Sequence, residues 1–114
     1  MVEPVRIQLS RRKGFRLQEA SLALNGLPAV KVDRTTIWGN NFAVEDFDSV
    51  EECVDMFEHD LNKFACFHAD KFDTYMRPLL GKNLACWCRL DAACHADVLL
   101  SEARQYALYC QQVA

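Results

Sequence analysis

The sequence lacks the long apolar segments that secretion or membrane insertion requires. Its beginning, MVEPVRIQLS, has no apolar core of the kind found in signal peptides, and no later run approaches the length of a bilayer span. These absences predict a cytoplasmic protein with no membrane partner. In a reducing compartment, its six cysteines are expected to be buried thiols, metal ligands or reactive thiolates, because disulfide frameworks do not persist there.

The chain also lacks internal repeats, low-complexity tracts and an excess of positive charge. It has 114 residues, of which 51% are hydrophobic and 25% charged, and its formal net charge is −3. This composition predicts a globular protein with a single domain over residues 1–114. Nucleic acid is not favoured as a partner, because a general nucleic-acid-binding protein is usually more basic. The basic residues that crowd the first segment form either a phosphate site or a solvated loop: Arg6, Arg11, Arg12, Lys13 and Arg16.

Three segments have the patterns of β-strands. Residues 5–9 and 29–33 alternate apolar and polar side chains, which is the period of a strand with one covered face, and residues 84–88 read as a buried strand. Residues 44–47 could add a short edge strand. Residues 15–28 fit either a short helix or an ordered loop.

Three further segments have helical periodicity. Ser49 and Glu52 form a capping box that begins a helix. Its apolar face carries Cys53, Met56, Phe57, Leu61 and Phe64. A second helix is expected over residues 70–80 and a third over about 94–110. Strands separated by helices predict a small α/β fold with a sheet of three to four strands, at least partly parallel and packed by helices.

The residues most able to carry chemistry gather in one stretch, NLACWCRLDAACHADVLL, at positions 83–100. Strand alternation places Cys86 and Cys88 on the same face, and Cys94 and His95 open the last helix. A short turn would bring that helix start back to the carboxyl end of the strand. The four groups can therefore converge.

Three interpretations of this stretch remain open at the level of sequence. Three thiolates and an imidazole would suit tetrahedral zinc, with Cys86, Cys88, Cys94 and His95 as ligands. Against this, Cys-x-Cys on an extended strand is expected to hold its sulfurs farther apart than a zinc knuckle does, and two adjacent residues do not easily aim at one ion. Alternatively, the helix N-terminus lowers the pKa of Cys94, which makes it a candidate catalytic nucleophile with His95 as donor or acid/base. The third interpretation is that all of these residues only pack or cap.

Two motifs together resemble a domain-of-unknown-function family that is spread through bacterial and phage genomes. They are VDRTTIWGNNF at residues 32–42 and GKNLACWCRLDAACHADVLL at residues 81–100. The family typically has proline where this chain has Asn41, and another proline in the turn after CWC, which here reads RLDAA. Both loops are therefore expected to be less rigid in this protein.

The resemblance implies a site in a crevice at the carboxyl ends of the strands. Arg34 would bind a carboxylate or phosphate, Asp33 would orient Arg34, and Trp38 would stack on a base or sugar. The backbone of Gly39 and Asn40 would approach the ligand closely. The opposite wall would come from Cys88, Cys94 and His95. In the alternative interpretation, Trp38 and Phe42 belong to the core, Gly39 and Asn40 form a turn, and Arg34 pairs with a surface carboxylate.

The leading hypothesis is a small domain that binds, and in an enzymatic version processes, an anionic small molecule such as a nucleotide or nucleotide derivative. On this hypothesis the protein needs no cofactor, and whether it is an enzyme stays open. Two other classes compete with it. One is a zinc-stabilised interaction module, and the other is a phage-type regulator that binds a host protein through its acidic helix face.

Overall fold

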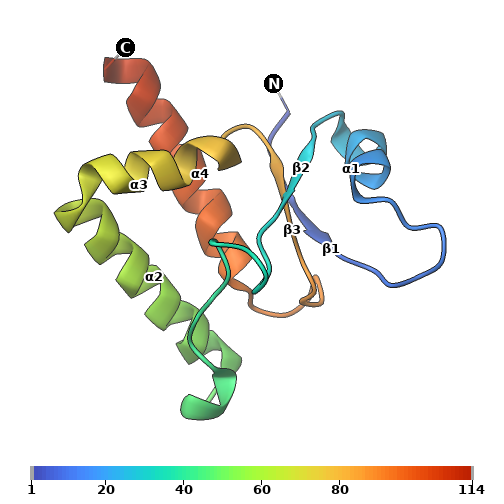
Figure 1. Ribbon diagram of the computed structural model, residues 1–114, viewed down its shortest axis with the longest axis horizontal. Helices are drawn as coiled ribbons and strands as arrows, with labels where there is room; N and C mark the ends of the chain where they lie inside the picture. The colour runs from blue at the N-terminus through green and yellow to red at the C-terminus, as the bar shows by residue number, and fades with distance from the viewer. Residues whose placement is uncertain (1, 114) are drawn as a thin grey trace.

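A three-stranded parallel sheet organises the protein, as seen in a computed structural model that describes residues 2–113 (Figure 1). The strands are β1 (Arg6–Gln8), β2 (Ala29–Lys31) and β3 (Asn83–Cys86), and β3 lies between the other two. Both of its neighbours run parallel to it. The predicted small α/β fold with parallel pairing is confirmed.

The central strand is buried on both faces, as parallel strands usually are. All four of its residues, NLAC, are buried. Leu84 and Cys86 point to the larger core, which also contains Phe57 and Leu99. Ala85 points to a smaller core on the other face, with Ile7. The alternation expected from the sequence therefore holds along this strand.

The helices cover the two faces of the sheet unequally. In Figure 1, α1 lies on one side of the sheet and the other helices lie on the other side. Their bounds are α1 (Leu17–Asn25), α2 (Val50–Phe67), α3 (Ala69–Met76) and α4 (His95–Val113), with a 3₁₀ turn η2 (Arg77–Leu79) after α3. Residues 15–28, for which the sequence allowed a short helix or an ordered loop, thus contain a helix. The helix α1 ends at Gly26, whose φ of 80° suits glycine.

The first residues of α2 show the expected cap. The Ser49 hydroxyl accepts a hydrogen bond from the Glu52 backbone N–H at 3.1 Å, and the Glu52 carboxylate accepts one from the Asp48 N–H at 3.2 Å. On the apolar face of this helix, Cys53 and Phe57 are buried. Met56 is 41% exposed, because its position is at the edge of that face.

A buried polar cluster fixes the amino end of β3. The Asn83 side chain donates hydrogen bonds to Ser21 Oγ and Asn25 Oδ1, both at 2.8 Å, and accepts one from the Val5 backbone N–H at 2.9 Å. These bonds connect β3 to α1 and to the residue before β1. The opposite, carboxyl end of β3 is the end that carries the cysteines.

The expected edge strand at residues 44–47 is wrong. Val44–Asp46 form a 3₁₀ turn, η1, in which the Ala43 carbonyl accepts from the Asp46 N–H at 3.0 Å and the Val44 carbonyl accepts from the Phe47 N–H at 3.1 Å. This local turn satisfies backbone groups that would otherwise need a partner strand.

Across residues 2–113, no helix combines the length and the apolar character that crossing a membrane would demand.

Candidate metal centre

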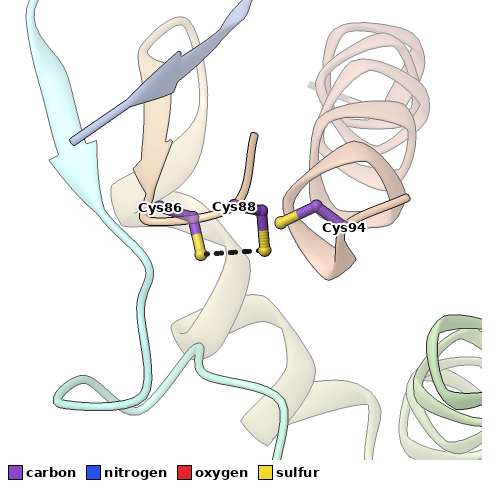
Figure 2. Close-up of side chains that lie close together, drawn as sticks. All are labelled: Cys86, Cys88 and Cys94. Atoms are coloured by element: carbon purple, nitrogen blue, oxygen red, sulfur yellow. Dashed lines mark hydrogen bonds between the residues drawn. The ribbon is translucent and has the colours of Figure 1, made fainter. Parts of the chain in front are cut away.

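Three cysteines come together where β3 ends and α4 begins (Figure 2). Cys86 is the last residue of β3, Cys88 lies two residues beyond it, and Cys94 immediately precedes α4. The Sγ atoms of Cys86 and Cys88 are 3.8 Å apart, and all three sulfurs lie within 4.8 Å of one another. All six cysteines of the chain are free thiols. The trio of Cys86, Cys88 and Cys94, called the cysteine trio below, could hold a metal ion.

The expectation that Cys-x-Cys holds its sulfurs too far apart is wrong. It assumed that the strand continues through residue 88, whereas β3 ends at Cys86 and residues 87–88 form a bend. In Figure 2 the Cys86 and Cys88 side chains point in the same direction, and Cys94 points toward them from the start of α4. The bend therefore produces the close spacing of a knuckle.

The His95 ring lies beside the cysteine trio without joining it. Its Nε2 is 2.7 Å from the Val32 carbonyl oxygen, which can only accept, so Nε2 carries a hydrogen and donates. Its Nδ1 lies 3.7 Å from Cys94 Sγ, and its ring packs edge-on against Phe57 with centroids 5.2 Å apart. His95 thus lies against Cys94 through Nδ1, while the Val32 carbonyl holds its ring from the other side.

The three thiols of the cysteine trio differ in how readily they ionise. Hydrogen bonding from the Cys86 thiol lowers the pKa of Cys94 well below its usual value, against the opposing effect of burial, and His95 and the Ala96 backbone N–H contribute further hydrogen bonds. The same hydrogen bond, together with burial, raises the pKa of Cys86, and burial raises that of Cys88. Of the three thiols, Cys94 is therefore the one whose surroundings most favour the ionised form.

A cleft of about 420 Å³ opens beside the trio. Its lining includes most of the residues that the sequence singled out: Asp33, Arg34, Asn40, Cys86, Cys88, Cys94 and His95. The loop after β2 supplies one wall, and the bend after β3 with the start of α4 supplies the other. Val50, Cys53 and Val54 of α2 also line the cleft. The volume is within the range of small-molecule sites.

A family model for a domain of unknown function, DUF4326, matches residues 7–105. The chain belongs to the DUF4326 family. The match covers the cysteine trio and both walls of the cleft. No curated protein and no solved structure matches the chain.

In this DUF4326 domain, Trp38 lies away from the cleft. Its Nε1 donates a hydrogen bond to the Tyr75 carbonyl in α3 at 2.8 Å, and its ring packs against the core and against the Tyr75 ring, with centroids 6.2 Å apart. Trp38 therefore attaches the loop after β2 to α3. This is the core alternative for Trp38 that the sequence left open.

Gly39 and Asn40 stabilise the same loop. A Cβ on Gly39 would lie 2.6 Å from Arg34 Cα and 2.7 Å from the Asp33 carbonyl oxygen. The backbone at residue 39 packs so closely against residues 33 and 34 that only glycine fits there. The Asn40 Oδ1 accepts from the Phe42 N–H at 2.9 Å, and its Nδ2 lies 3.4 Å from the Cys53 carbonyl oxygen. Of these two residues, only Asn40 lines the cleft.

The Asp33 carboxylate does not pair with the Arg34 guanidinium, contrary to the expectation that Asp33 would orient Arg34. Its carboxylate accepts hydrogen bonds from the Thr35 hydroxyl at 2.6 Å and from Trp87 Nε1 at 2.9 Å, and it lies 3.8 Å from the Lys31 ammonium. The Arg34 Nη2 instead donates to the Phe42 carbonyl at 3.2 Å. Asp33 thus links the loop after β2 to the bend after β3.

Sequence patterns did not predict the places of Trp87 and Arg6 in this DUF4326 site. Trp87 lines the cleft, is 39% exposed, and has the Arg11 guanidinium 4.6 Å from its ring centroid. Strand alternation predicted that Trp87 faces away from the cysteines. The strand ends at Cys86, so alternation does not apply to Trp87 in the bend. The side chain of Arg6 is only 7% exposed, although its place in the basic first segment predicted either a phosphate site or a solvated loop.

Proposed function

We propose that the domain binds one zinc ion through Cys86, Cys88 and Cys94 and presents the fourth coordination position to a small anionic ligand in the cleft. The sulfur spacing carries this proposal. Zinc–sulfur bonds of about 2.3 Å at tetrahedral angles put neighbouring sulfurs about 3.8 Å apart. The Cys86–Cys88 separation is 3.8 Å, and the third sulfur lies within 4.8 Å of both.

Within residues 2–113, the group of metal-ligating atoms has three members and no fourth, which distinguishes this centre from a closed structural zinc site. His95 points its Nε2 to Val32 and lies outside the cluster of metal-ligating atoms. Zinc sites with three protein ligands keep one position for water or substrate, whereas structural sites have four. The adjacent cleft provides the space for such a ligand.

The charges around the cleft favour an anionic ligand. Zinc with three thiolates has a net charge of −1, so an anion needs compensating positive charge nearby. Arg34 lines the cleft, and Arg11 lies over Trp87 at its wall. A guanidinium binds carboxylate or phosphate groups in a bidentate manner. Nucleotide derivatives are one member of this ligand class, with the Trp87 ring taking the stacking role first expected of Trp38.

Metal analysis with matched cysteine variants tests the zinc centre. Protein purified without chelators should contain about one equivalent of zinc, and Cys88→Ser and Cys94→Ser should each lose it. Cys66 is exposed and outside the trio, so Cys66→Ser is the control and should retain the metal. Zinc that persists in both trio variants, or is absent from wild-type protein supplied with zinc, would overturn the proposal.

The ligand is tested on the cobalt-substituted protein. Because the visible bands of tetrahedral cobalt respond to the fourth ligand, titration with inorganic phosphate or acetate should shift them. Arg34→Gln should weaken that response by roughly tenfold, which corresponds to the loss of one charged hydrogen bond. A spectrum that neither anion changes would contradict the open position.

A second candidate function is nucleophilic chemistry at Cys94. Its low pKa, its place before the first turn of α4 and its contact with His95 are the features of a nucleophilic thiolate. In metal-free protein, iodoacetamide should then alkylate Cys94 at neutral pH faster than Cys66. If Cys94 reacts only at alkaline pH, in the manner of an ordinary thiol, this candidate fails.

A further inference from the structure

The Trp87 ring is held in the wall of the cleft by contacts on its edge and on one face. Its Nε1 donates a hydrogen bond to the Asp33 carboxylate at 2.9 Å, and the Arg11 guanidinium carbon lies 4.6 Å from the ring centroid. The Asp33 carboxylate is itself fixed, because it also accepts a hydrogen bond from the Thr35 hydroxyl at 2.6 Å. The orientation of the indole is therefore set before a ligand binds, so stacking on it costs little conformational entropy.

These contacts leave one part of the ring for a ligand. An indole has a single N–H donor and no acceptor, and the donor of Trp87 is already used by Asp33. Arg11 covers one face of the ring and, of the residues that the structure describes, is not among those that line the cleft, whereas Trp87 is. Trp87 therefore presents uncovered ring surface to the cleft, and such a surface binds another flat ring or an apolar group.

The rest of the cleft has more apolar surface than a bare anion can cover. Val44 and Val50 are exposed side chains that line it, as Trp87 is, and Val54 also lines it. The cleft measures about 420 Å³, whereas one water molecule occupies about 30 Å³, so a phosphate or acetate ion would leave most of the space to solvent. These features favour a ligand whose anionic group is joined to a larger apolar part.

We infer that the ligand joins a flat aromatic ring to its anionic group, and that Trp87 selects this ligand by stacking on the ring. The inference rests on the proposed function, in which Arg34 and the fourth zinc position hold the anionic group. It adds that selectivity among anions comes from one side chain on the wall of the cleft. Nucleotides and aryl carboxylates share this chemistry, and different probes distinguish them.

Pairs of anions that differ in the ring test this selectivity by calorimetry on zinc-loaded wild-type protein. Adenosine 5′-monophosphate should bind roughly 10- to 100-fold more tightly than ribose 5-phosphate, because stacking of one base on an aromatic side chain has about this effect. Benzoate should bind more tightly than cyclohexanecarboxylate, which has the same carbon skeleton but no flat ring. A preference for the flat ring in either pair supports the inference, and the pair with the larger preference indicates a nucleotide or an aryl carboxylate. Equal affinities within both pairs would overturn it.

Variants at Trp87 separate stacking from a structural role. Trp87→Leu removes the flat ring and keeps an apolar side chain, so it should abolish the preference for adenosine 5′-monophosphate while ribose 5-phosphate binds as it does to wild type. Trp87→Phe loses the hydrogen bond to Asp33 but keeps an aromatic face, and it should retain part of the preference. If Trp87→Leu weakens both ligands equally, or changes neither, the ring only packs and the inference is wrong.

Fluorescence reports on the ring without any change at Trp87. The chain has two tryptophans, and Trp38 bonds to the Tyr75 carbonyl away from the cleft, so Trp38→Phe makes Trp87 the single emitter and is the control for binding. Adenosine 5′-monophosphate should quench this emission as it binds, and an unchanged emission would contradict stacking. If the protein takes up no zinc, or binds none of the four anions, the proposed function fails and this inference fails with it. If the protein binds them without preferring the flat rings, only the role of Trp87 fails.

Discussion

Individual side chains around the cysteine trio determine where negative charge can reside. Cys94 receives hydrogen bonds from the Cys86 thiol and the Ala96 backbone, so it is the thiol that ionises first. The hydrogen bond with Cys94 and burial raise the pKa of Cys86, and burial raises that of Cys88. A metal ion that binds all three must therefore displace protons, which makes zinc affinity fall as the pH is lowered.

At Asp33, the structure predicts a specific dependence of stability on pH. Although burial opposes it, hydrogen bonds from Thr35 and Trp87 hold the pKa of this carboxyl below its usual value. A lowered pKa in the folded state means that the ionised group stabilises the protein above about pH 4, its unfolded pKa, and that this contribution is lost as the pH falls through the folded pKa.

The measurement is urea unfolding of wild type and Asp33→Asn between acidic and neutral pH. The difference in unfolding free energy should be largest above about pH 4 and should shrink below it. A difference that stays constant through that range would show that ionisation of the Asp33 carboxyl does not stabilise the folded protein.

Gly39 supplies a second prediction for a single residue. Because a Cβ would lie 2.6 Å from Arg34 Cα, Gly39→Ala should force the loop after β2 apart and cost about 1–3 kcal/mol of unfolding free energy. Asn41→Ala, at an exposed position in the same loop, is the control. Equal urea midpoints for the two variants would mean that the loop tolerates the added methyl group.

At the level of elements, two connections bring the site together: the segment from β3 to α4, which begins with the bend at residues 87–88, and the loop after β2. Trp38 attaches the last of these to α3 through the Tyr75 carbonyl. We expect Trp38→Phe to lower the unfolding free energy by about 1 kcal/mol through the lost hydrogen bond.

The same variant should leave zinc affinity unchanged, because Trp38 bonds to the Tyr75 carbonyl and does not line the cleft beside the trio. Trp87→Phe is the informative comparison, since it removes the hydrogen-bond donor to Asp33 and should raise the pKa of that carboxyl. An NMR titration of the Asp33 carboxyl would measure this rise. A loss of zinc in Trp38→Phe protein that remains folded would contradict this separation of roles.

Much of this arrangement could be predicted from local patterns. Alternation placed Leu84 and Cys86 on one face, and the capping residue Ser49 marked where α2 begins. The convergence of Cys86, Cys88 and Cys94 followed from a strand that turns into a helix. These features depend on residues close together in the chain, which is why sequence patterns carry them.

The remaining features depend on contacts between distant segments, which periodicity does not encode. Arg6 donates hydrogen bonds to backbone carbonyls more than 80 positions away, in the loop before α4, and Trp87 and Asp33 are 54 positions apart. The sulfur spacing of the Cys-x-Cys pair was also mispredicted, because the strand ends two residues earlier than its pattern suggested.

For the whole molecule, the centre joins the end of the central strand to the longest helix, so metal binding should stabilise the fold globally. At a free zinc concentration 100-fold above Kd, the folded state gains about 2.7 kcal/mol, which raises Tm by roughly 10 °C for a domain of this size. Thermal unfolding with zinc and with chelator measures the difference. Cys88→Ser should show no zinc-dependent rise, and a rise equal to that of wild type would contradict binding at the trio.

Zinc K-edge X-ray absorption of the wild-type protein tests the central claim most directly. A zinc ion held by Cys86, Cys88 and Cys94 with one open position should show three sulfur neighbours at about 2.3 Å and one oxygen or nitrogen neighbour at about 2.0 Å. Addition of the anionic ligand should change only the lighter neighbour. Four sulfur neighbours, or a shell dominated by nitrogen and oxygen, would contradict the account.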